Sequence, residues 1–208
     1  MSLITDAVAE FQAQLCGSGC EDNNVTLKRA PEGPACQYPR GAIIAAQFGG
    51  KTAHITTNFP VEATTRISFL FGSALETPLQ RAAALALINV SLGFLCLERR
   101  INACPSDAYP ACLSGLAGHL EGRRIALLGS MPAIERSMPE RIVDDPAMAD
   151  VILVTGDALC SDNGLAVCDA YRDSGRLLFL GPETSGICSL LSLAHWCPYG
   201  RSSLENGR

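Results

Sequence analysis

The chain of 208 residues lacks the composition expected of a nucleic-acid-binding or membrane protein. Its formal net charge is −5, and no basic run is longer than a pair such as Arg99–Arg100 or Arg123–Arg124, so no basic face is predicted. The longest apolar stretch, residues 82–97, falls short of the roughly 20 residues that a membrane-spanning helix needs. The N-terminus has neither the charged nor the apolar region of a signal peptide. We therefore expect a cytoplasmic protein that binds no nucleic acid and no membrane.

The motifs of several common enzyme classes are also absent. The sequence contains no GxGxxG dinucleotide fingerprint, no Walker A loop, no HExxH and no GxSxG. The only lysines are Lys28 and Lys51, and both precede the part of the chain in which we predict a parallel sheet. Pyridoxal phosphate chemistry needs a Schiff-base lysine, so it is a poor interpretation here.

Cysteine is plentiful, but it is not arranged in a recognisable metal-binding pattern. There are ten cysteines, with no CxxC pair and no spacing typical of a zinc site. Without a signal peptide we expect them to remain thiols rather than to form disulfides. Free cysteine is among the most buried residue types, so most of them are expected to be small core residues.

The first 75 residues have the pattern of a small α+β unit. Residues 24–30 are strand-like, and residues 41–58 form two strand-like runs around Gly49–Gly50, which favours a hairpin. A helix is expected before Gly17, because four apolar residues recur there at helical spacing: Ile4, Val8, Phe11 and Leu15.

A long helix is expected to begin at Pro78. Thr77 and Gln80 form a capping box around Pro78, and the residues that follow are apolar on nearly every face. Such a helix must be buried all round, either between two parts of the chain or against a second copy. Residues 101–121 contain two prolines and two glycines and are interpreted as mostly a connector.

The remaining chain repeats one plan three times. The segments RIALLGS, DVILVTGD and RLLFLGP, which begin at Arg124, Asp150 and Arg176, are short apolar runs that end in glycine. Near-continuous apolar strands are typical of parallel sheets covered on both faces. Residues 163–175 have helical spacing, so they complete a βαβ unit whose right-handed crossover brings the glycines to one edge. We predict an α/β chain with two domains, residues 1–75 and 76–208.

The carboxyl edge of this predicted sheet is the expected ligand site, because open α/β sheets bind ligands there. Polar side chains crowd after the second strand, from Asp157 to Asn163. Asp157 is a candidate ligand for a metal, a ribose or an amine, or else a loop carboxylate. Cys160 is a candidate soft-metal ligand or nucleophile, or else a buried thiol. Asp162 and Asn163 are expected to cap the following helix.

Two further groups of residues admit both functional and structural interpretations. Arg81, in the first turn of an apolar helix, either binds an anion or forms an ion pair, and Asn89 is expected to bond to backbone. Near the C-terminus, His195 and Cys197 lie two residues apart and contact one metal if the chain is extended there. The alternative is that this aromatic segment packs the C-terminus down.

In their order, the segments PLQRAAALALINVS, GRRIALLGSMP, ADVILVTGDAL and LLFLGPETSG resemble the heavy-metal-chelation domain family of bacteria and archaea. The resemblance covers about residues 75–190. It implies an enolase-N-terminal-like domain joined to a Rossmann-like domain, a pocket between them, a homodimer, and a divalent transition metal or metal-binding small molecule as ligand. Residues 133–148 are shorter than the corresponding family segment. The candidate ligand-binding positions that the resemblance implies are Arg81, Asn89, Gly129, Thr155, Gly156, Gly181 and Pro182.

Three functional hypotheses follow, of which the first two are centred on the predicted edge. The first is a protein that binds a metal ion or a metal-chelating small molecule, with Asp157, Cys160, His195 and Cys197 as metal ligands. Ser130, beside Gly129, is a further candidate ligand-binding residue. The second is a transferase-like enzyme that acts on a small polar substrate in the same cleft. The third is an interaction module whose apolar helix, around residues 90–94, pairs with a partner.

Overall fold

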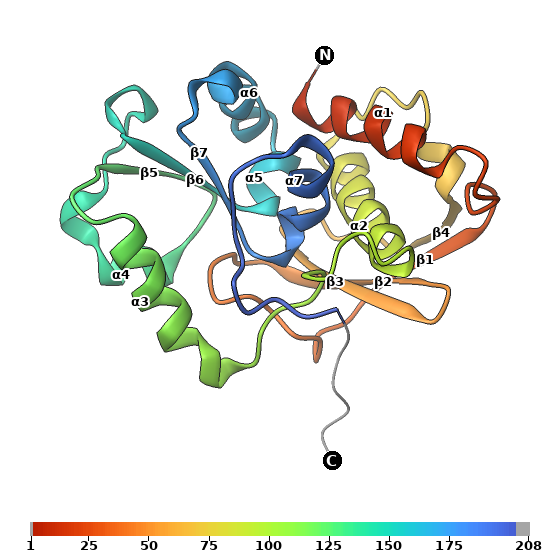
Figure 1. The fold of residues 1–208 in the computed structure, drawn as a ribbon, viewed down its shortest axis with the longest axis horizontal. Coiled ribbons are helices and arrows are strands. Elements are labelled where there is room, and N and C mark those ends of the chain that lie inside the picture. Colours follow the sequence, from red (N-terminus) through yellow and green to blue (C-terminus); the bar gives the residue numbers. More distant parts are fainter. Residues whose placement is uncertain (1, 203–208) are drawn as a thin grey trace.

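The computed structural model describes residues 2–202 and contains two separate sheets (Figure 1). One is antiparallel, with strand order β3-β2-β1-β4, and the other is parallel, with strand order β5-β6-β7-β8. This arrangement confirms the predicted fold class, a small α+β unit followed by a Rossmann-like parallel sheet. Residues 203–208 of the predicted second domain lie outside the described residues.

The predicted helix, strand and hairpin of the N-terminal unit are present, and a fourth strand and a 3₁₀ helix follow them. The Ser2 side chain caps the first helix, whose Ile4, Val8, Phe11 and Leu15 are buried. Gly49 and Gly50 connect two strands with φ of +55° and +77°, which the absence of a Cβ permits. The elements are α1 (Leu3–Leu15), β1 (Asn24–Arg29), β2 (Ala42–Phe48), β3 (Lys51–Thr57), β4 (Ala63–Arg66) and the short 3₁₀ helix η1 (Ile67–Leu70).

Helix α2 (Pro78–Phe94) lies inside the molecule (Figure 1). The predicted capping box is present, with Thr77 and Gln80 each bonded to the other's backbone N–H. One side of α2 packs on β2 and β3, and the other packs on α5 (Gly156–Cys160) and α7 (Ser185–Leu191). The helix is therefore sandwiched between two parts of one chain. Val90 and Leu92, which the interaction-module hypothesis offers to a partner, are buried within the chain itself.

The parallel sheet is covered on both faces, as its apolar strands predict. In β6, Val151 and Leu153 join one apolar cluster, whereas Ile152 and Val154 join the other. Helices α3 and α4 cover the first face, and α5, α6 and α7 cover the second. The bounds are α3 (Tyr109–His119), β5 (Ile125–Leu128), α4 (Pro132–Ser137), β6 (Val151–Val154), α6 (Asp162–Tyr171), β7 (Leu177–Leu180) and β8 (His195–Trp196).

Helix α3 corrects the expectation of a connector over residues 101–121. Pro110 stands in its first turn, where proline is tolerated, and Cys112 and Leu116 form a buried stripe four residues apart. Two prolines and two glycines are typical of a connector, so composition alone did not reveal this buried stripe. A 3₁₀ turn, η2 (Ser106–Ala108), precedes this helix.

The segment between β5 and β6 contains no further strand of the sheet. It holds α4 and two 3₁₀ turns, η3 (Pro139–Arg141) and η4 (Pro146–Met148). Ile142 forms a single parallel bridge with Ile125, so one residue pair covers the outer edge of β5. Two other 3₁₀ turns follow α6 and β7, namely η5 (Arg172–Ser174) and η6 (Pro182–Thr184).

One apolar core cluster joins the two units. It includes residues of α1, β1–β3, α2, β6, β7 and α7, so no break in packing marks the predicted boundary at residue 75. No helix within residues 2–202 has both the length and the apolar character that crossing a membrane requires.

Candidate functional site

The predicted glycine tips meet at one rim of the parallel sheet. Parallel pairing aligns the ends of β5, β6 and β7, which are followed by Gly129, Gly156 and Gly181. The tips touch their neighbours, since a Cβ on Gly129 would collide with Oγ1 of Thr155, and one on Gly156 would lie 2.6 Å from Cβ of Glu183. Gly129 and Gly181 have positive φ, so these turns depend on glycine.

Asp157, the leading candidate at this rim, is bonded to the N-terminal unit. Its Oδ1 accepts hydrogen bonds from the Thr57 hydroxyl (3.1 Å) and the Asn58 backbone N–H (2.7 Å). Its Oδ2 accepts one from the Asn58 side-chain amide (2.7 Å). Because Asp157 is only 9% exposed, the end of β3 covers the carboxylate in the position where a ligand was expected. In this structure Asp157 joins the two units.

Arg81 and Cys160 take part in a second contact of this kind. Arg81 is buried and donates Nε to the Cys160 carbonyl (2.7 Å) and Nη1 to the carbonyls of Leu75 and Glu76 (both 3.0 Å). Its Nη2 forms an ion pair with Asp162. Of the two interpretations of Arg81, the ion pair is the one present.

The Cys160 thiol is enclosed beside the same residues. It donates to the Gly156 carbonyl at 3.3 Å. Burial raises its pKa well above the ordinary value, as does the charge of Asp157. A neutral, enclosed thiol is a poor nucleophile. The cap of α6 is Ser161, whose Oγ accepts from the Gly164 N–H, rather than Asp162 or Asn163.

Asn89 bonds to backbone, as predicted, and it fixes the turn after β7. Its Nδ2 donates to the carbonyls of Pro182 and Glu183, each at 3.1 Å, and its Oδ1 accepts from the Gly186 N–H at 2.8 Å. The remaining rim residues differ in exposure. Thr155 and Pro182 are buried, whereas Ser130 is exposed.

The four predicted metal ligands are not gathered into a centre. His195 donates Nε2–H to the Gly181 carbonyl (2.8 Å), and burial lowers its pKa. Cys197 is 9% exposed, and burial raises its pKa, with the charge of Glu183 as a further cause. Within residues 2–202, no three side chains of His, Cys, Asp or Glu form a group that could hold a metal ion. The expected set of Asp157, Cys160, His195 and Cys197 is therefore corrected, because each is committed or enclosed separately.

The residue that sequence reasoning missed is Glu183, after the Gly181–Pro182 turn. It is 2% exposed, and its Oε2 has no hydrogen-bond partner among the described residues. Burial raises its pKa to about 7, although hydrogen bonds from its own backbone N–H and from Thr56 act in the opposite direction. A signal existed, because Glu183 lies two residues after the strand-end Gly181, much as Asp157 directly follows Gly156.

Thiols from separate segments lie near Glu183. A Cβ on Gly181 would collide with Oε2 of Glu183 and lie 3.3 Å from Sγ of Cys36. Burial raises the pKa of Cys36, and the charges of Glu183, Cys197 and Cys104 add to that shift. Burial also raises the pKa of Cys104. This end of the sheet therefore holds neutral thiols beside an acid that titrates near neutrality.

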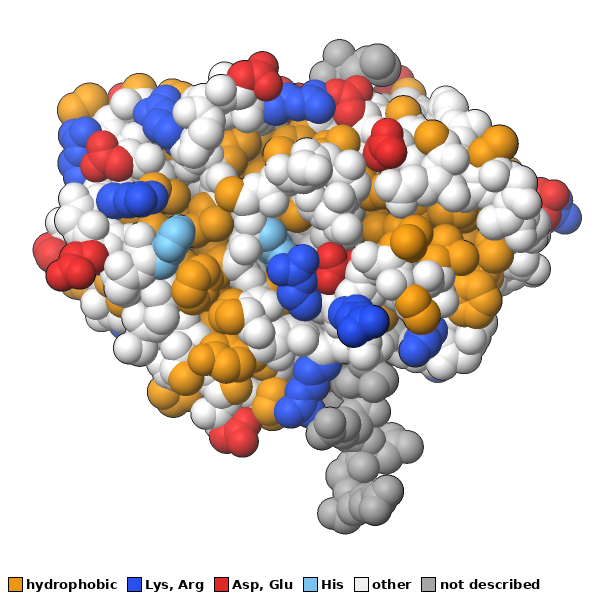
Figure 2. Space-filling view, in the orientation of Figure 1, with side chains coloured by type: hydrophobic (Ala, Val, Ile, Leu, Met, Phe, Trp, Pro, Cys, Tyr) orange, Lys and Arg blue, Asp and Glu red, His pale blue; other side chains and the backbone are white. Residues whose placement is uncertain are grey.

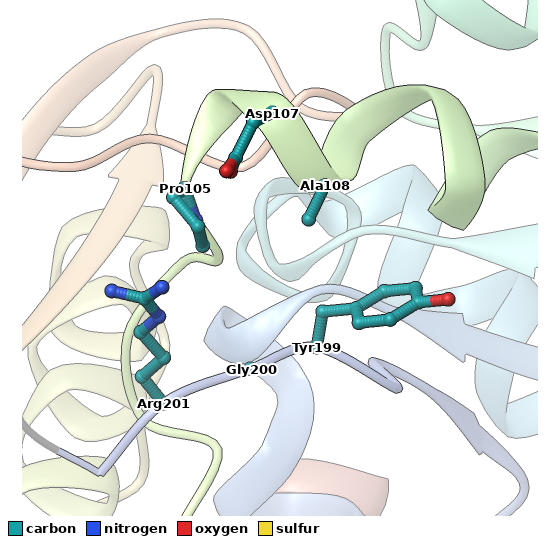
Figure 3. Close-up of a pocket in the computed structure, with 6 residues that line it drawn as sticks. All are labelled: Pro105, Asp107, Ala108, Tyr199, Gly200 and Arg201. Carbon is teal, nitrogen blue, oxygen red and sulfur yellow. The ribbon is translucent and has the colours of Figure 1, made fainter.

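A surface pocket of about 380 Å³ opens beside this thiol-rich region (Figure 3). One wall is the turn η2 and the other is the chain after β8, and Asp107 and Ala108 point across the gap. The pocket is not lined by Asp157 or by the glycine tips. Its lining residues are Pro105, Asp107, Ala108, Tyr199, Gly200 and Arg201.

Asn102 holds the two walls together and ties them to the N-terminal unit. Its backbone exchanges two hydrogen bonds with Arg201, at 3.0 and 2.9 Å. Its side chain donates to the Thr52 carbonyl (2.9 Å) and accepts from Nδ1–H of His54 (2.8 Å). Gly200 is required by close approach, because a Cβ there would lie 2.6 Å from Sγ of Cys197. These hydrogen bonds connect the three segments at whose junction the pocket lies.

Comparison of the chain with protein-family models, with curated proteins and with solved structures finds no match in any of the three.

Proposed function

We propose that this protein binds a small polar molecule in the pocket between η2 and the chain after β8. The observation that carries the proposal is the position of this pocket. It lies where the chain leaves the carboxyl end of β8, the edge at which open α/β sheets bind ligands. A pocket of the same volume beside a loop far from this edge would give little support to a ligand site.

The size and the lining of the pocket support a ligand smaller than a dinucleotide. A volume of about 380 Å³ is near the lower end of the range of roughly 300–1,000 Å³ that small-molecule sites span. Charged, aromatic and apolar groups all line it, which is the mixture that orients a ligand as well as enclosing it.

The resemblance to the heavy-metal-chelation family implies a metal ion or a metal-chelating small molecule as the ligand. The residues present do not fit a bare ion, since residues 2–202 offer no group of three suitable side chains. Only a metal-chelating small molecule is compatible with these residues, because the small molecule itself would supply most of the donors to a metal. We therefore retain the chelating molecule and not a protein-held metal centre.

A second candidate function is an enzyme acting on a small polar substrate, and Glu183 favours it. A buried carboxyl group whose pKa is near 7 is suited to general acid–base chemistry at neutral pH. Glu183 does not line the pocket, so this role would require the substrate to reach past the surrounding thiols.

The test is a thermal-shift screen of the full chain and of Ala108→Phe, which fills the pocket from one wall. The probes are free amino acids, nucleosides, nucleotides, small carboxylic acids and amines, each with and without Zn²⁺, Ni²⁺ or Co²⁺. We expect at least one organic class to raise the melting temperature of the native chain and not that of Ala108→Phe. Ala63→Phe, on the exposed strand β4, is the matched control and should respond like the native chain.

Two outcomes contradict the proposal. One is that no organic probe stabilises the native chain. The other is that a probe stabilises Ala108→Phe to the same extent, which would move the site elsewhere. Stabilisation by the metal ions alone would favour the bare-ion hypothesis that the geometry does not support.

A further inference from the structure

Cys36 is a partly exposed thiol in a loop that is bonded to the start of helix α3. Tyr109, the first residue of α3, holds both neighbours of this cysteine. Its hydroxyl donates to the Ala35 carbonyl, and its carbonyl accepts from Nε2 of Gln37 at 3.0 Å. These two contacts set the position of the Cys36 backbone against the parallel-sheet unit.

The thiol of Cys36 and the carboxyl group of Glu183 border the same space. A Cβ on Gly181 would collide with Oε2 of Glu183 and would lie 3.3 Å from Sγ of Cys36. Because residue 181 is glycine, this space is left open. No side chain of residue 181 therefore separates the sulfur atom from the carboxyl oxygen.

Oε2 of Glu183 is an acceptor that the chain does not use. The side chain is 2% exposed, and Oε2 has no hydrogen-bond partner within residues 2–202. Such an oxygen costs free energy, so a buried acceptor without a donor calls for an explanation in function. The S–H of Cys36 is a donor at the same place.

The other titratable groups around this pair are neutral near pH 7 or bonded elsewhere. Burial raises the pKa of three of them, namely Cys104, Cys197 and Tyr109. The Asp157 carboxylate bonds to the end of β3, and His195 donates to the backbone of the turn after β7. Arg100, whose charge acts on Cys197, is paired with Glu98.

The surface beside the Cys36 loop is also largely uncharged. Figure 2 shows mainly uncharged side chains, many of them apolar, over helix α3. A reactant without charge therefore fits this region better than an ionic one, which would leave water without a partner of opposite sign.

A carbonyl compound is the class of reactant that uses such a pair in full. Attack of a thiol on a carbonyl carbon releases one proton, and departure of the leaving group takes one up. A carboxyl group whose pKa is about 7 can accept the first proton and return it at neutral pH. Burial raises the pKa of Cys36, so its free thiolate is scarce and attack without a proton acceptor is slow.

We propose that Cys36 is a nucleophile toward uncharged esters and thioesters, and that Glu183 is its general base. The bond from Sγ to the carbonyl carbon forms while the thiol proton passes to the Glu183 carboxylate. Glu183 then gives this proton to the leaving alcohol or thiol as the C–O or C–S bond breaks. The products are S-acylated Cys36 and the free alcohol or thiol, and no oxidant or reductant is consumed.

This inference goes beyond ligand binding in the pocket after β8, because neither Cys36 nor Glu183 lines that pocket. The proposed function and this inference can each hold without the other.

Acetylation of the full chain by 4-nitrophenyl acetate tests the pair, with each thiol followed separately by mass spectrometry of its peptide. We expect the rate at Cys36 to rise with pH to a plateau with a midpoint near 7, where Glu183 ionises. Glu183→Gln keeps the shape of the side chain but removes the base. At pH 8 it should lower the rate at Cys36 by about 100-fold, the lower end of what general base catalysis contributes.

Two other thiols of the same samples serve as internal controls. Cys96 is exposed, and its acetylation rate should be equal in the native chain and in Glu183→Gln. Cys160 is buried and should stay unlabelled in both, which shows that the fold is kept. Glu32→Gln removes an exposed carboxyl group of the loop that holds Cys36 and should leave the rate at Cys36 unchanged.

Three results would overturn the inference. The first is an equal rate at Cys36 in the native chain and in Glu183→Gln. The second is a rate that shows no plateau and follows the thiolate alone through alkaline pH. The third is acetylation of Cys96 with none at Cys36 in the native chain.

Discussion

Among single residues, Glu183 lies in an environment far from that of water. Its carboxyl group is buried with one oxygen unpartnered, and burial raises its pKa from 4.5 to about 7. The unfolded chain therefore loses this proton at a lower pH than the folded protein does. The contribution of Glu183 to stability is consequently lost as the pH rises from about 4.5 to about 7, and it is constant above that range.

Glu183→Gln is expected to raise the free energy of unfolding at pH 8 by about 2–3 kcal/mol. The reason is that the ionised carboxylate is disfavoured by burial and the amide is not. At pH 5, where the native side chain is protonated, the two proteins should differ by less than about 1 kcal/mol. Urea unfolding at pH 5, 6, 7 and 8 measures the difference.

The exposed Glu32→Gln is the control for this comparison and should leave the pH profile of the native protein unchanged. A Glu183→Gln protein that is less stable than the native protein at pH 8 would contradict the account. A residue that lowers stability at working pH is more readily explained by a role in function than by a role in folding.

The site residues could be predicted from sequence only in part, because distant parts of the chain compete with a ligand for hydrogen bonds to these side chains. Asn89 bonds to backbone as expected, because a buried amide has few other options. Asp157 was placed correctly at a strand end, but its three hydrogen-bond donors come from residues 57 and 58, about 100 positions away. No local pattern could reveal that contact.

At the scale of elements, the close packing of α2 against α7 is one of the contacts that join the long helix to the parallel-sheet unit. Gly186 allows it, since its backbone N–H bonds to Asn89 and a Cβ there would press on Asn89 and lie 2.9 Å from Ile88. Both neighbours are buried on α2 and have little room to move.

Gly186→Ala is therefore expected to lower the free energy of unfolding by about 1–3 kcal/mol, the usual cost of overpacking. Gly118→Ala is the matched control, because Gly118 lies in α3 with ordinary φ and no atom within 4 Å of the added Cβ. That change should stabilise the protein by up to about 1 kcal/mol through helix propensity. Guanidinium unfolding of both variants tests the pair, and equal effects of the same sign would contradict this packing.

Elements with a strong periodic pattern were predicted well, whereas a helix interrupted by proline and glycine was not. The hairpin around Gly49–Gly50 and the buried helix from Pro78 formed where expected. Helix α3 was missed, because Pro110, Gly115 and Gly118 are typical of a connector. Its buried stripe forms against the parallel sheet, so tertiary packing overrides the local preference.

For the whole molecule, the shared core predicts that the two units unfold together. Residues of both sheets and of α2 belong to one apolar cluster. Trp196, the only tryptophan of the chain, lies in β8 and stacks on His119, with ring centroids 5.5 Å apart. Its fluorescence thus reports on the parallel sheet, whereas far-ultraviolet circular dichroism reports on all elements.

The two signals are expected to give the same urea midpoint, within about 0.2 M, and the same slope. The cause is that neither unit can expose its face of α2 without losing a large apolar contact. An early loss of ellipticity at constant fluorescence would show that the N-terminal unit opens first and would contradict a single cooperative core.

The single bridge between Ile125 and Ile142 has a consequence for solubility. It occupies backbone groups on the outer edge of β5, while the opposite edge strand, β8, has only two residues. Neither side of the parallel sheet therefore presents a long free ladder to which another chain could add a strand. A sequence that is 48% hydrophobic thus avoids offering a template for edge-to-edge aggregation through its most apolar sheet.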